Sequence, residues 1–250
     1  LHSTSRRQRQ MCIRDRSWIW NGIAPNYSKT FVCTKAALQT CKKYQTKEVL
    51  CTAWMDNGAE TPVDAVWPGV ALFAHLGFHL EYNEKVLEEE FKECVGGNLK
   101  DFMALDAFDS LFLNGKANQE AQNPSKYLLY QDPLAGIFDQ EVVMSGVDTG
   151  AYYEKLKEQM AACQENSPEY AALFTYYEKL AAVLSDKADL GVRMKAAYDK
   201  NQLLALKEIY EKEIPETIQN LEEMKILRED LWMSEAKPFG YELMLSLIHI

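Results

Sequence analysis

Two short apolar runs in the first third of the chain, each followed by a segment with helical spacing, constrain the fold most. The run SWIWNGIAP at residues 17–25 ends in a Pro-Asn turn, and the run EVLCTAW at residues 48–54 is rich in β-forming residues. Apolar side chains then recur at helical spacing over residues 29–44 and 63–76. Strands that are apolar throughout need cover on both faces. The order strand–helix–strand–helix therefore predicts a parallel sheet covered by helices.

Beyond residue 80 nearly the whole chain has an amphipathic, helical pattern, with long segments at 149–165, 168–200 and 201–232. Gly, Asn, Pro and Asp gather at residues 114–150 and predict a break. A coiled coil is an alternative for the last long segment, but its heptads do not persist, which favours a helical bundle. The predicted fold class is α/β plus all-α.

The two ends differ in composition from the rest. Residues 1–16 hold five arginines and no apolar periodicity, as a basic nucleic-acid-binding arm would. However, RRQRQMCIRD is what one frame of a transposon-type sequencing adapter encodes, and LSLIHI at residues 245–250 is what its reverse complement encodes. We therefore expect both ends to be adapter-derived and to belong to no fold, which leaves units at residues 17–80 and 81–244.

Charge and cysteine usage exclude several classes of partner. The net charge is −10 although the basic N-terminal end is included, which argues against nucleic acid and anionic membranes. No stretch approaches the roughly 18 apolar residues of a membrane helix. The cysteines form no CxxC pair and have no His cluster, which favours free thiols in a reducing compartment over a disulfide framework or zinc site. A cytoplasmic location follows as the expectation.

The segment TAWMDNGAETP, residues 52–62, carries the strongest functional signal. It lies at the carboxyl end of the second predicted strand, where parallel sheets and barrels hold their ligands. Trp54 offers a flat face for a sugar ring, and the carboxylates of Asp56 and Glu60 can accept hydrogen bonds from hydroxyl groups. The alternatives are a core tryptophan before a polar turn, and a glutamate that caps the helix starting near Val63.

Two more tryptophans lie on the first predicted strand. Alternation places Trp18 and Trp20 on one face and Ile19 on the other. Each tryptophan is a candidate either for the same ligand site or for packing inside a barrel.

These residues resemble a known family. SWIWNGIAPN, KAALQTCKK and EVLCTAWMDNGAETPVDAVWPGVALFAHLGF resemble the last two βα units of the (β/α)8 TIM barrel in family 20 glycoside hydrolases, the β-N-acetylhexosaminidases. FKECVGGNLKDFMALD, KYLLYQDPLAGIFD, SDKADLGVRMKAAYDK and WMSEAKPFGYE resemble the helical C-terminal domain that follows the barrel in one bacterial subgroup. The resemblance covers essentially the whole chain between its two ends.

The resemblance implies removal of terminal β-linked N-acetylhexosamine, GlcNAc or GalNAc, from a glycan or oligosaccharide. The reaction is substrate-assisted and retaining, with an Asp-Glu pair after the fourth barrel strand and no metal or organic cofactor. This sequence contains no Asp-Glu dipeptide. It therefore offers no catalytic residue, and we expect the fragment itself to be inactive.

The family's sugar-binding subsite on the eighth strand does carry over by resemblance. Its tryptophan wall matches Trp54, and the acid two residues later matches Asp56, with Met55 where the subgroup often has Gly. Glu60, Trp18 and Trp20 are further candidates for substrate binding. The alternative functions are a non-catalytic helical interaction module with a remnant barrel, and another carbohydrate-active TIM-barrel enzyme. An upstream reading frame with an Asp-Glu pair after a strand would discriminate between them.

Two other groups of residues favour structural roles. His75 and His79 have the i,i+4 spacing of metal ligands, but the sequence shows no HExxH motif and no third ligand, which favours a surface or interface role. Arg193 lies within reach of Asp186 and Asp189 on a predicted helix, where Gly191 allows another backbone to come close. An ion pair is the first interpretation, and a contribution to the barrel mouth is the second.

Overall fold

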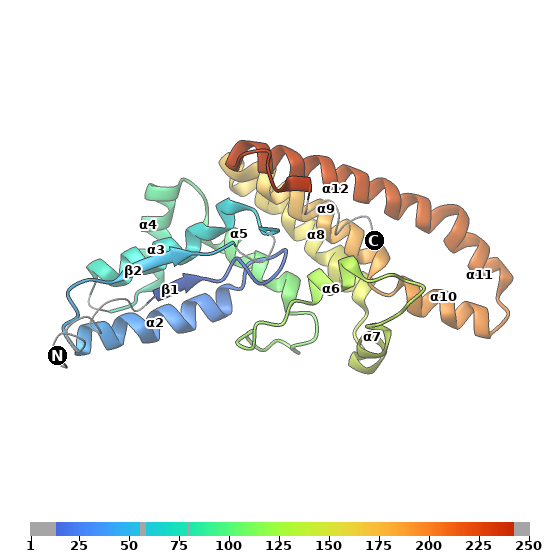
Figure 1. Cartoon of the computed structure of the whole chain (residues 1–250), viewed down its shortest axis with the longest axis horizontal. Helices are drawn as coiled ribbons and strands as arrows, with labels where there is room; N and C mark the ends of the chain where they lie inside the picture. The colour runs from blue at the N-terminus through green and yellow to red at the C-terminus, as the bar shows by residue number, and fades with distance from the viewer. Residues whose placement is uncertain (1–13, 56–58, 80, 243–250) are drawn as a thin grey trace, which may run out of the picture.

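The computed structural model describes residues 14–55, 59–79 and 81–242. Figure 1 shows an elongated molecule, with the two strands and their helices at one end and long helices at the other. None of the helices in the described ranges is long and apolar enough to cross a membrane.

In the described residues, two strands that alternate with helices come first, and the elements after β2 are all helices. The elements, in chain order, are β1 (Arg14–Ser17), α2 (Tyr27–Lys43), β2 (Leu50–Ala53), η1 (Val63–Val66), α3 (Trp67–Phe78), α4 (Glu84–Val95), α5 (Leu99–Met103), η2 (Ala104–Asp109), α6 (Pro124–Tyr130), α7 (Asp139–Ser145), α8 (Thr149–Asn166), η3 (Pro168–Tyr170), α9 (Ala171–Lys187), α10 (Leu190–Asp199), α11 (Leu203–Glu208), η4 (Ile209–Glu213) and α12 (Ile214–Glu235).

The two strands are parallel neighbours, as the sequence predicts. Their register sets Arg14 opposite Leu50 and Ser17 opposite Ala53. Helix α2 connects the strands and packs against α3. The amide side chain of Asn26 caps α2 by accepting the backbone N–H of Lys29 at 2.9 Å.

The first strand differs from its expected position. The sequence predicts a strand within residues 17–25, but β1 ends at Ser17 and the rest of that run is bent, irregular backbone. The strand also reaches three residues into segment 1–16, for which no fold was expected. The remainder of that segment, and residues 245–250, lie outside the described residues.

The helical remainder is a bundle with one protruding arm. Helices α8 and α9 pack side by side, and α12 lies along α9, while α10 and α11 extend away from them (Figure 1). The expected break at residues 114–150 contains the short helices α6 and α7. The helical prediction for the other segments is confirmed.

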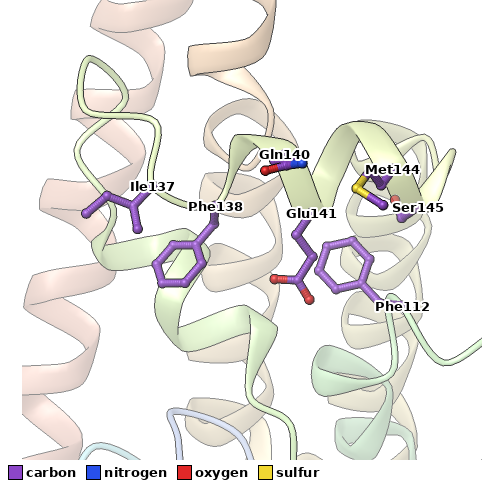
Figure 2. A pocket seen from close by; sticks show the side chains of 7 residues that line it. All are labelled: Phe112, Ile137, Phe138, Gln140, Glu141, Met144 and Ser145. Atoms are coloured by element: carbon purple, nitrogen blue, oxygen red, sulfur yellow. The ribbon is translucent and has the colours of Figure 1, made fainter.

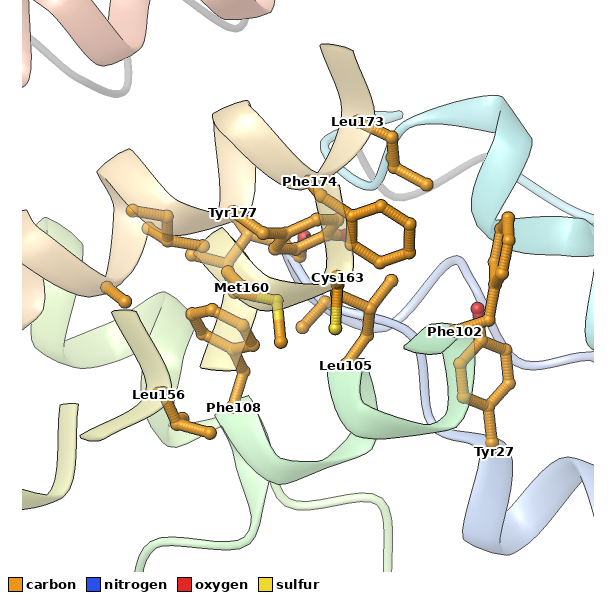
Figure 3. Packing of buried hydrophobic residues seen from close by; sticks show 14 of the residues in the cluster. Tyr27, Phe102, Leu105, Phe108, Leu156, Met160, Cys163, Leu173, Phe174 and Tyr177 are labelled. Atoms are coloured by element: carbon orange, nitrogen blue, oxygen red, sulfur yellow. Dashed lines mark hydrogen bonds between the residues drawn. The ribbon is translucent and has the colours of Figure 1, made fainter. Parts of the chain in front are cut away.

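One hydrophobic core crosses from the strand-containing part into the helical part. Tyr27 of α2 and Phe102 of α5 belong to the same buried cluster as Phe108, Phe174 and Tyr177. Figure 3 shows this aromatic packing, in which Phe102 contacts Phe174 edge-to-face with ring centroids 5.4 Å apart. The two parts of the chain therefore bury their apolar surface against each other, and this fixes the loops at their junction.

Candidate functional site

Two of the candidate substrate residues, Trp18 and Trp54, directly follow the carboxyl ends of β1 and β2. Because the strands are parallel and Ser17 pairs with Ala53, the residues that follow them leave at the same edge of the sheet. Trp18 follows the first strand and Trp54 the second. This is the edge where parallel sheets bind ligands.

The pair of tryptophans after β1 has the alternation that the sequence predicts. The rings of Trp18 and Trp20 lie 5.0 Å apart and are partly exposed. Ile19 between them is buried on the other side against Ala65. The Nζ of Lys29 lies 4.3 Å from the centre of the Trp18 ring, a cation–π contact that covers one face of that ring.

Trp54 after β2 is also partly exposed. Its indole N–H donates to the hydroxyl of Thr52 at 3.0 Å, which orients the ring against its own strand. Met55 packs against the small cluster around Ile19, so the start of the loop after β2 packs against the loop after β1. Asp56 lies outside the described residues.

Glu60, the last of the candidate residues, is buried and bound to the helical part. Its carboxylate lies 2.8 Å from the Nζ of Lys126 and accepts a hydrogen bond from the hydroxyl of Tyr130 at 3.2 Å. Burial, with the nearby Glu60 charge, raises the pKa of the Tyr130 phenol. Lys126 and Tyr130 of α6 therefore each contact one carboxylate oxygen of Glu60. The helix that starts at Val63 is capped by Glu235, whose carboxylate accepts the Val63 N–H at 3.0 Å.

The backbone of this loop is held by a buried arginine. Arg228 of α12 donates through Nε to the carbonyl of Glu60 at 3.2 Å and through its terminal nitrogen to the carbonyl of Ala59 at 2.9 Å. Its other terminal nitrogen lies 3.8 Å from the carboxylate of Glu235. One guanidinium therefore connects α12 to two consecutive carbonyls of the loop after β2.

The loop after β1 is held from the same side by asparagines. The amide of Asn26 donates to the carbonyl of Asn118 at 2.8 Å, and that of Asn123 donates to the carbonyl of Asn21, also at 2.8 Å. The hydroxyl of Tyr177 donates to the carbonyl of Ile23 at 3.0 Å. The bonds to the carbonyls of Asn21 and Ile23 satisfy backbone acceptors of this enclosed loop, which strand pairing would otherwise do.

Buried acids lie beneath the loop after β1. Burial raises the pKa of Asp109 to about 7, even though its carboxylate accepts two hydrogen bonds from Ser125. Burial also raises the pKa of Asp106, which accepts the backbone N–H of Ser28 at 3.1 Å. The second oxygen of Asp109 faces Gly22 in the loop. Ionisation of Asp109 would therefore place a negative charge against the loop after β1.

His75 and His79 meet a third group that the sequence did not reveal. Glu90 of α4 accepts from Nδ1 of His75 at 2.6 Å and lies 2.5 Å from Nε2 of His79. This trio has the donor types of a metal site. However, Nε2 of His75 accepts the backbone N–H of Asn83 at 3.1 Å, so the proton of the neutral ring lies on Nδ1, where a metal would bind. The trio is therefore a hydrogen-bonded clamp between α3 and α4.

The comparison with protein families identifies the helical part. The family model of the Glycoside Hydrolase 20C C-terminal domain matches residues 100–247, more than half of the chain. The chain belongs to this family. The predicted relationship to family 20 glycoside hydrolases, with a helical C-terminal domain, is thereby confirmed. No curated protein matches the chain.

The 20C C-terminal domain supplies the side chains that hold both loops at the carboxyl edge. These side chains are Asn123, Lys126, Tyr130, Tyr177, Arg228 and Glu235, and Asn118 adds its backbone carbonyl as the acceptor for Asn26. Sequence reasoning did not find them, because their partners are distant in the chain. One signal was present: Arg228 lies on the same helical face as the buried Met224 and Leu231. A charge on an apolar stripe indicates a specific partner.

Arg193 has the structural role that was its first interpretation. Its guanidinium donates to the carboxylate of Asp189 at 2.8 Å, to the carbonyl of Asp186 at 2.9 Å, and to the carboxylate of Glu213. These contacts join α10 to the end of α9 and to the end of η4 within the 20C domain. The close approach expected at Gly191 is also confirmed, because an added Cβ would lie 2.6 Å from the carbonyl oxygen of Pro133.

The 20C domain also has an open pocket beside α7, of about 510 Å³. Figure 2 shows Phe112 and Phe138 at this pocket, with Ile137 and Met144 nearby. None of the candidate substrate residues lines it. The pocket is therefore separate from the site at the carboxyl ends of the strands.

Proposed function

We propose that this chain is the C-terminal part of a family 20 glycoside hydrolase that removes terminal β-linked N-acetylhexosamine from glycans. In this proposal β1 and β2 are the last two strands of a (β/α)8 barrel, and the loops after them form part of the sugar subsite. The observation that carries the proposal is the exit of Trp18 and Trp54 at one edge of a parallel pair, in a chain with a 20C C-terminal domain.

The proposed subsite stacks the sugar on Trp54 and holds its outer hydroxyls through Asp56. Trp18 and Trp20 extend the apolar wall. Glu60 contributes through the fold of the loop, since its carboxylate is bound to Lys126 and Tyr130. Within the described ranges, Cys33, Cys41, Cys94 and Cys163 are free thiols, which supports a reducing, cytoplasmic location.

The acid and the carboxylate that steers the acetamido group belong to an Asp-Glu pair that this sequence lacks. Binding residues alone cannot supply the proton that the leaving group needs. We therefore expect the chain to release no nitrophenol from a nitrophenyl β-N-acetylglucosaminide, while the complete parent enzyme does. Release by the chain alone would contradict this assignment, and an inactive parent would favour the interaction module.

Substitutions in the complete parent test the subsite. Trp54→Ala should reduce kcat/KM by removing the stacking wall. Asp56→Asn should cost about 1.5–3 kcal/mol of transition-state binding, if the carboxylate accepts charge-assisted hydrogen bonds from sugar hydroxyls. If both folded variants keep the kcat/KM of the parent, the proposed subsite is wrong and Trp54 has a packing role only.

A further inference from the structure

Helix α7 and the loop before it expose large apolar side chains. Leu134 and Ile137 in the loop are 83% and 73% exposed, and Met144 on α7 is 76% exposed. Ile137 and Met144 border the open pocket that Phe112 and Phe138 also line (Figure 2). We call residues 131–145 with this pocket the α7 surface. Contiguous apolar side chains on the outside of a folded chain mark a place where another molecule binds.

The α7 surface is preformed, because the backbone of its loop is fixed from below. The Nζ of Lys187 donates to the carbonyl of Gln131 at 2.6 Å, and the carboxylate of Asp132 accepts the N–H of Leu134 at 2.8 Å. The carbonyl of Pro133 lies against α10. The loop is therefore held in place while its apolar side chains point to solvent. A preformed surface loses less conformational freedom on binding than a mobile one.

The arm formed by α10 and α11 exposes a second group of large apolar side chains. Four of them are at least 72% exposed: Tyr198, Leu203, Leu204 and Tyr210. The first three flank the turn between α10 and α11, and Tyr210 follows in η4. We call residues 195–212 the arm tip. It lies at the end of the molecule opposite to the strands (Figure 1), away from the core of this chain.

The two surfaces carry opposite charge. The α7 surface, residues 131–145, contains three acids and no lysine or arginine. The arm tip contains four lysines and three acids, a net charge of +1 in a chain whose net charge is −10. Two copies of such an acidic chain repel each other over most of their surface. The arm tip of one copy is instead attracted to the α7 surface of another.

The apolar area of the two surfaces is enough for a stable dimer. With Val143, which is 61% exposed, they present eight large apolar side chains that are mostly exposed. Each can bury roughly 100 Å² of apolar surface. A twofold axis covers both surfaces of each copy at once, because every contact occurs twice. Each copy then buries about 800 Å², the size of a standard stable interface.

We propose that the partner is a second copy of this chain: in a twofold dimer, the arm tip of each copy packs against the α7 surface of the other. Leu204 and its neighbours then cover the pocket at Phe112 and Phe138, and the lysines of the arm tip face the acids of the α7 surface. The dimer goes beyond the proposed hydrolase function and does not depend on it, since neither surface includes a candidate substrate residue.

Sedimentation velocity of the whole chain over a range of concentrations tests the dimer. Leu204→Asp and Met144→Asp each place a charge in both apolar contacts and should raise the Kd of the dimer at least about tenfold. Both side chains are exposed, so the core of each variant stays intact. Phe78→Asp on α3 is the matched control, because Phe78 is 90% exposed and belongs to neither surface. It should leave the Kd unchanged.

A mixture of the two variants tests which surfaces meet. In a heterodimer of Leu204→Asp and Met144→Asp, the unchanged arm tip of the second variant meets the unchanged α7 surface of the first. One of the two contacts is then restored, so the mixture should associate more tightly than either variant alone. Benzoylphenylalanine at position 204 should also crosslink to residues 131–145 of an isotope-labelled second copy.

A wild-type chain that stays monomeric at every concentration would overturn the proposal. A dimer with the same Kd in Leu204→Asp, Met144→Asp and Phe78→Asp would overturn it as well, because the copies would then meet through another part of the chain. A mixture that associates no more tightly than the separate variants, or crosslinks from position 204 to residues outside 131–145, would reject the contact between arm tip and α7 surface.

Discussion

The Nζ of Lys126 lies 2.8 Å from the carboxylate of Glu60, so helix α6 of the 20C domain is ion-paired to the loop after β2. The Glu60 side chain is only 1% exposed. A carboxylate removed from water to this degree is costly unless it is paired, so the bond specifies how the loop docks more than it adds stability. The same residue was expected from sequence to bind sugar hydroxyls or to cap a helix.

Removing the lysine should be more harmful than removing both partners. Lys126→Met leaves a buried carboxylate without its cation and should lower the free energy of unfolding by about 3 kcal/mol. The double variant Lys126→Met with Glu60→Gln should recover part of this loss, as a urea-denaturation double-mutant cycle would measure. The control is Lys195→Met, which breaks an exposed i,i+4 pair with Asp199 and should cost about 0.5 kcal/mol or less. Equal losses for Lys126→Met and Lys195→Met would contradict a buried ion pair.

A second prediction concerns the close approach of α10 to the loop before α7. In Gly191→Ala, the new Cβ would meet the carbonyl oxygen of Pro133 at 2.6 Å and the carboxylate of Asp139 at 3.0 Å. The backbone must move, and we expect a loss of about 1–3 kcal/mol in thermal or urea unfolding. Gly77→Ala in α3 is the matched control, because no atom lies within 4 Å of its added Cβ. It should leave stability equal or raise it by up to about 1 kcal/mol. A Gly191→Ala protein as stable as Gly77→Ala would show that this contact is loose.

The parts of the fold that the sequence predicts are those with local signals. The apolar run around Leu50 and the helical spacing after it predict β2 and α3, and the parallel pairing follows from their order. The sequence misplaces the first strand, because the apolar run after β1 is buried in a loop and its pattern resembles that of a buried strand. Ile19 and Ile23 are buried in a loop whose backbone bonds go to side chains such as Tyr177.

For the candidate site too, the sequence predicts the features that depend on local pattern and misses the partners that lie far along the chain. The sequence places Trp54 at the end of its strand, because strand polarity is a local property, whereas Trp18 and Trp20 follow β1 and do not lie within it. The partners of Glu60 and of the loop backbone were not predicted, because Lys126 and Arg228 reach them from helices far along the chain. Pattern identifies the face of a helix, but it does not identify what that face meets.

A third prediction concerns the clamp between α3 and α4. Hydrogen bonds from His79 and His75 lower the pKa of Glu90 below its ordinary value of 4.5. The clamp therefore contributes stability above that value and loses it as the pH falls through the lowered pKa. Glu90→Gln should melt at a lower temperature than wild type at pH 7, and the gap should narrow below about pH 4.5 and close once the pH falls below the lowered pKa of Glu90. Glu89→Gln, at the exposed neighbouring position, should match wild type throughout. A gap that stays constant with pH would assign the effect to packing instead of ionisation.

The last prediction concerns Asp109, whose pKa is raised and not lowered. Its effect on stability therefore changes with pH in the opposite direction to that of Glu90. Its pKa is raised to about 7 by burial, so between pH 4 and pH 7 the folded protein holds a proton that the unfolded chain releases. Stability from this group is complete at low pH and is lost as the pH rises through about 7. Asp109→Asn has no such proton and keeps an oxygen for the two hydrogen bonds from Ser125.

The difference in unfolding free energy between Asp109→Asn and wild type should therefore shift in favour of the variant from pH 5 to pH 8. Urea denaturation of both proteins at several pH values measures it, with Asp199→Asn as the control at an exposed acid. Asp106 lies nearby with a raised pKa of its own, and its charge helps to raise the pKa of Asp109, so the measured difference belongs to the pair of carboxyls. Parallel stability profiles would show that Asp109 is ionised in the folded protein. In that case water or protein dipoles beneath the loop after β1 would stabilise the negative charge of Asp109.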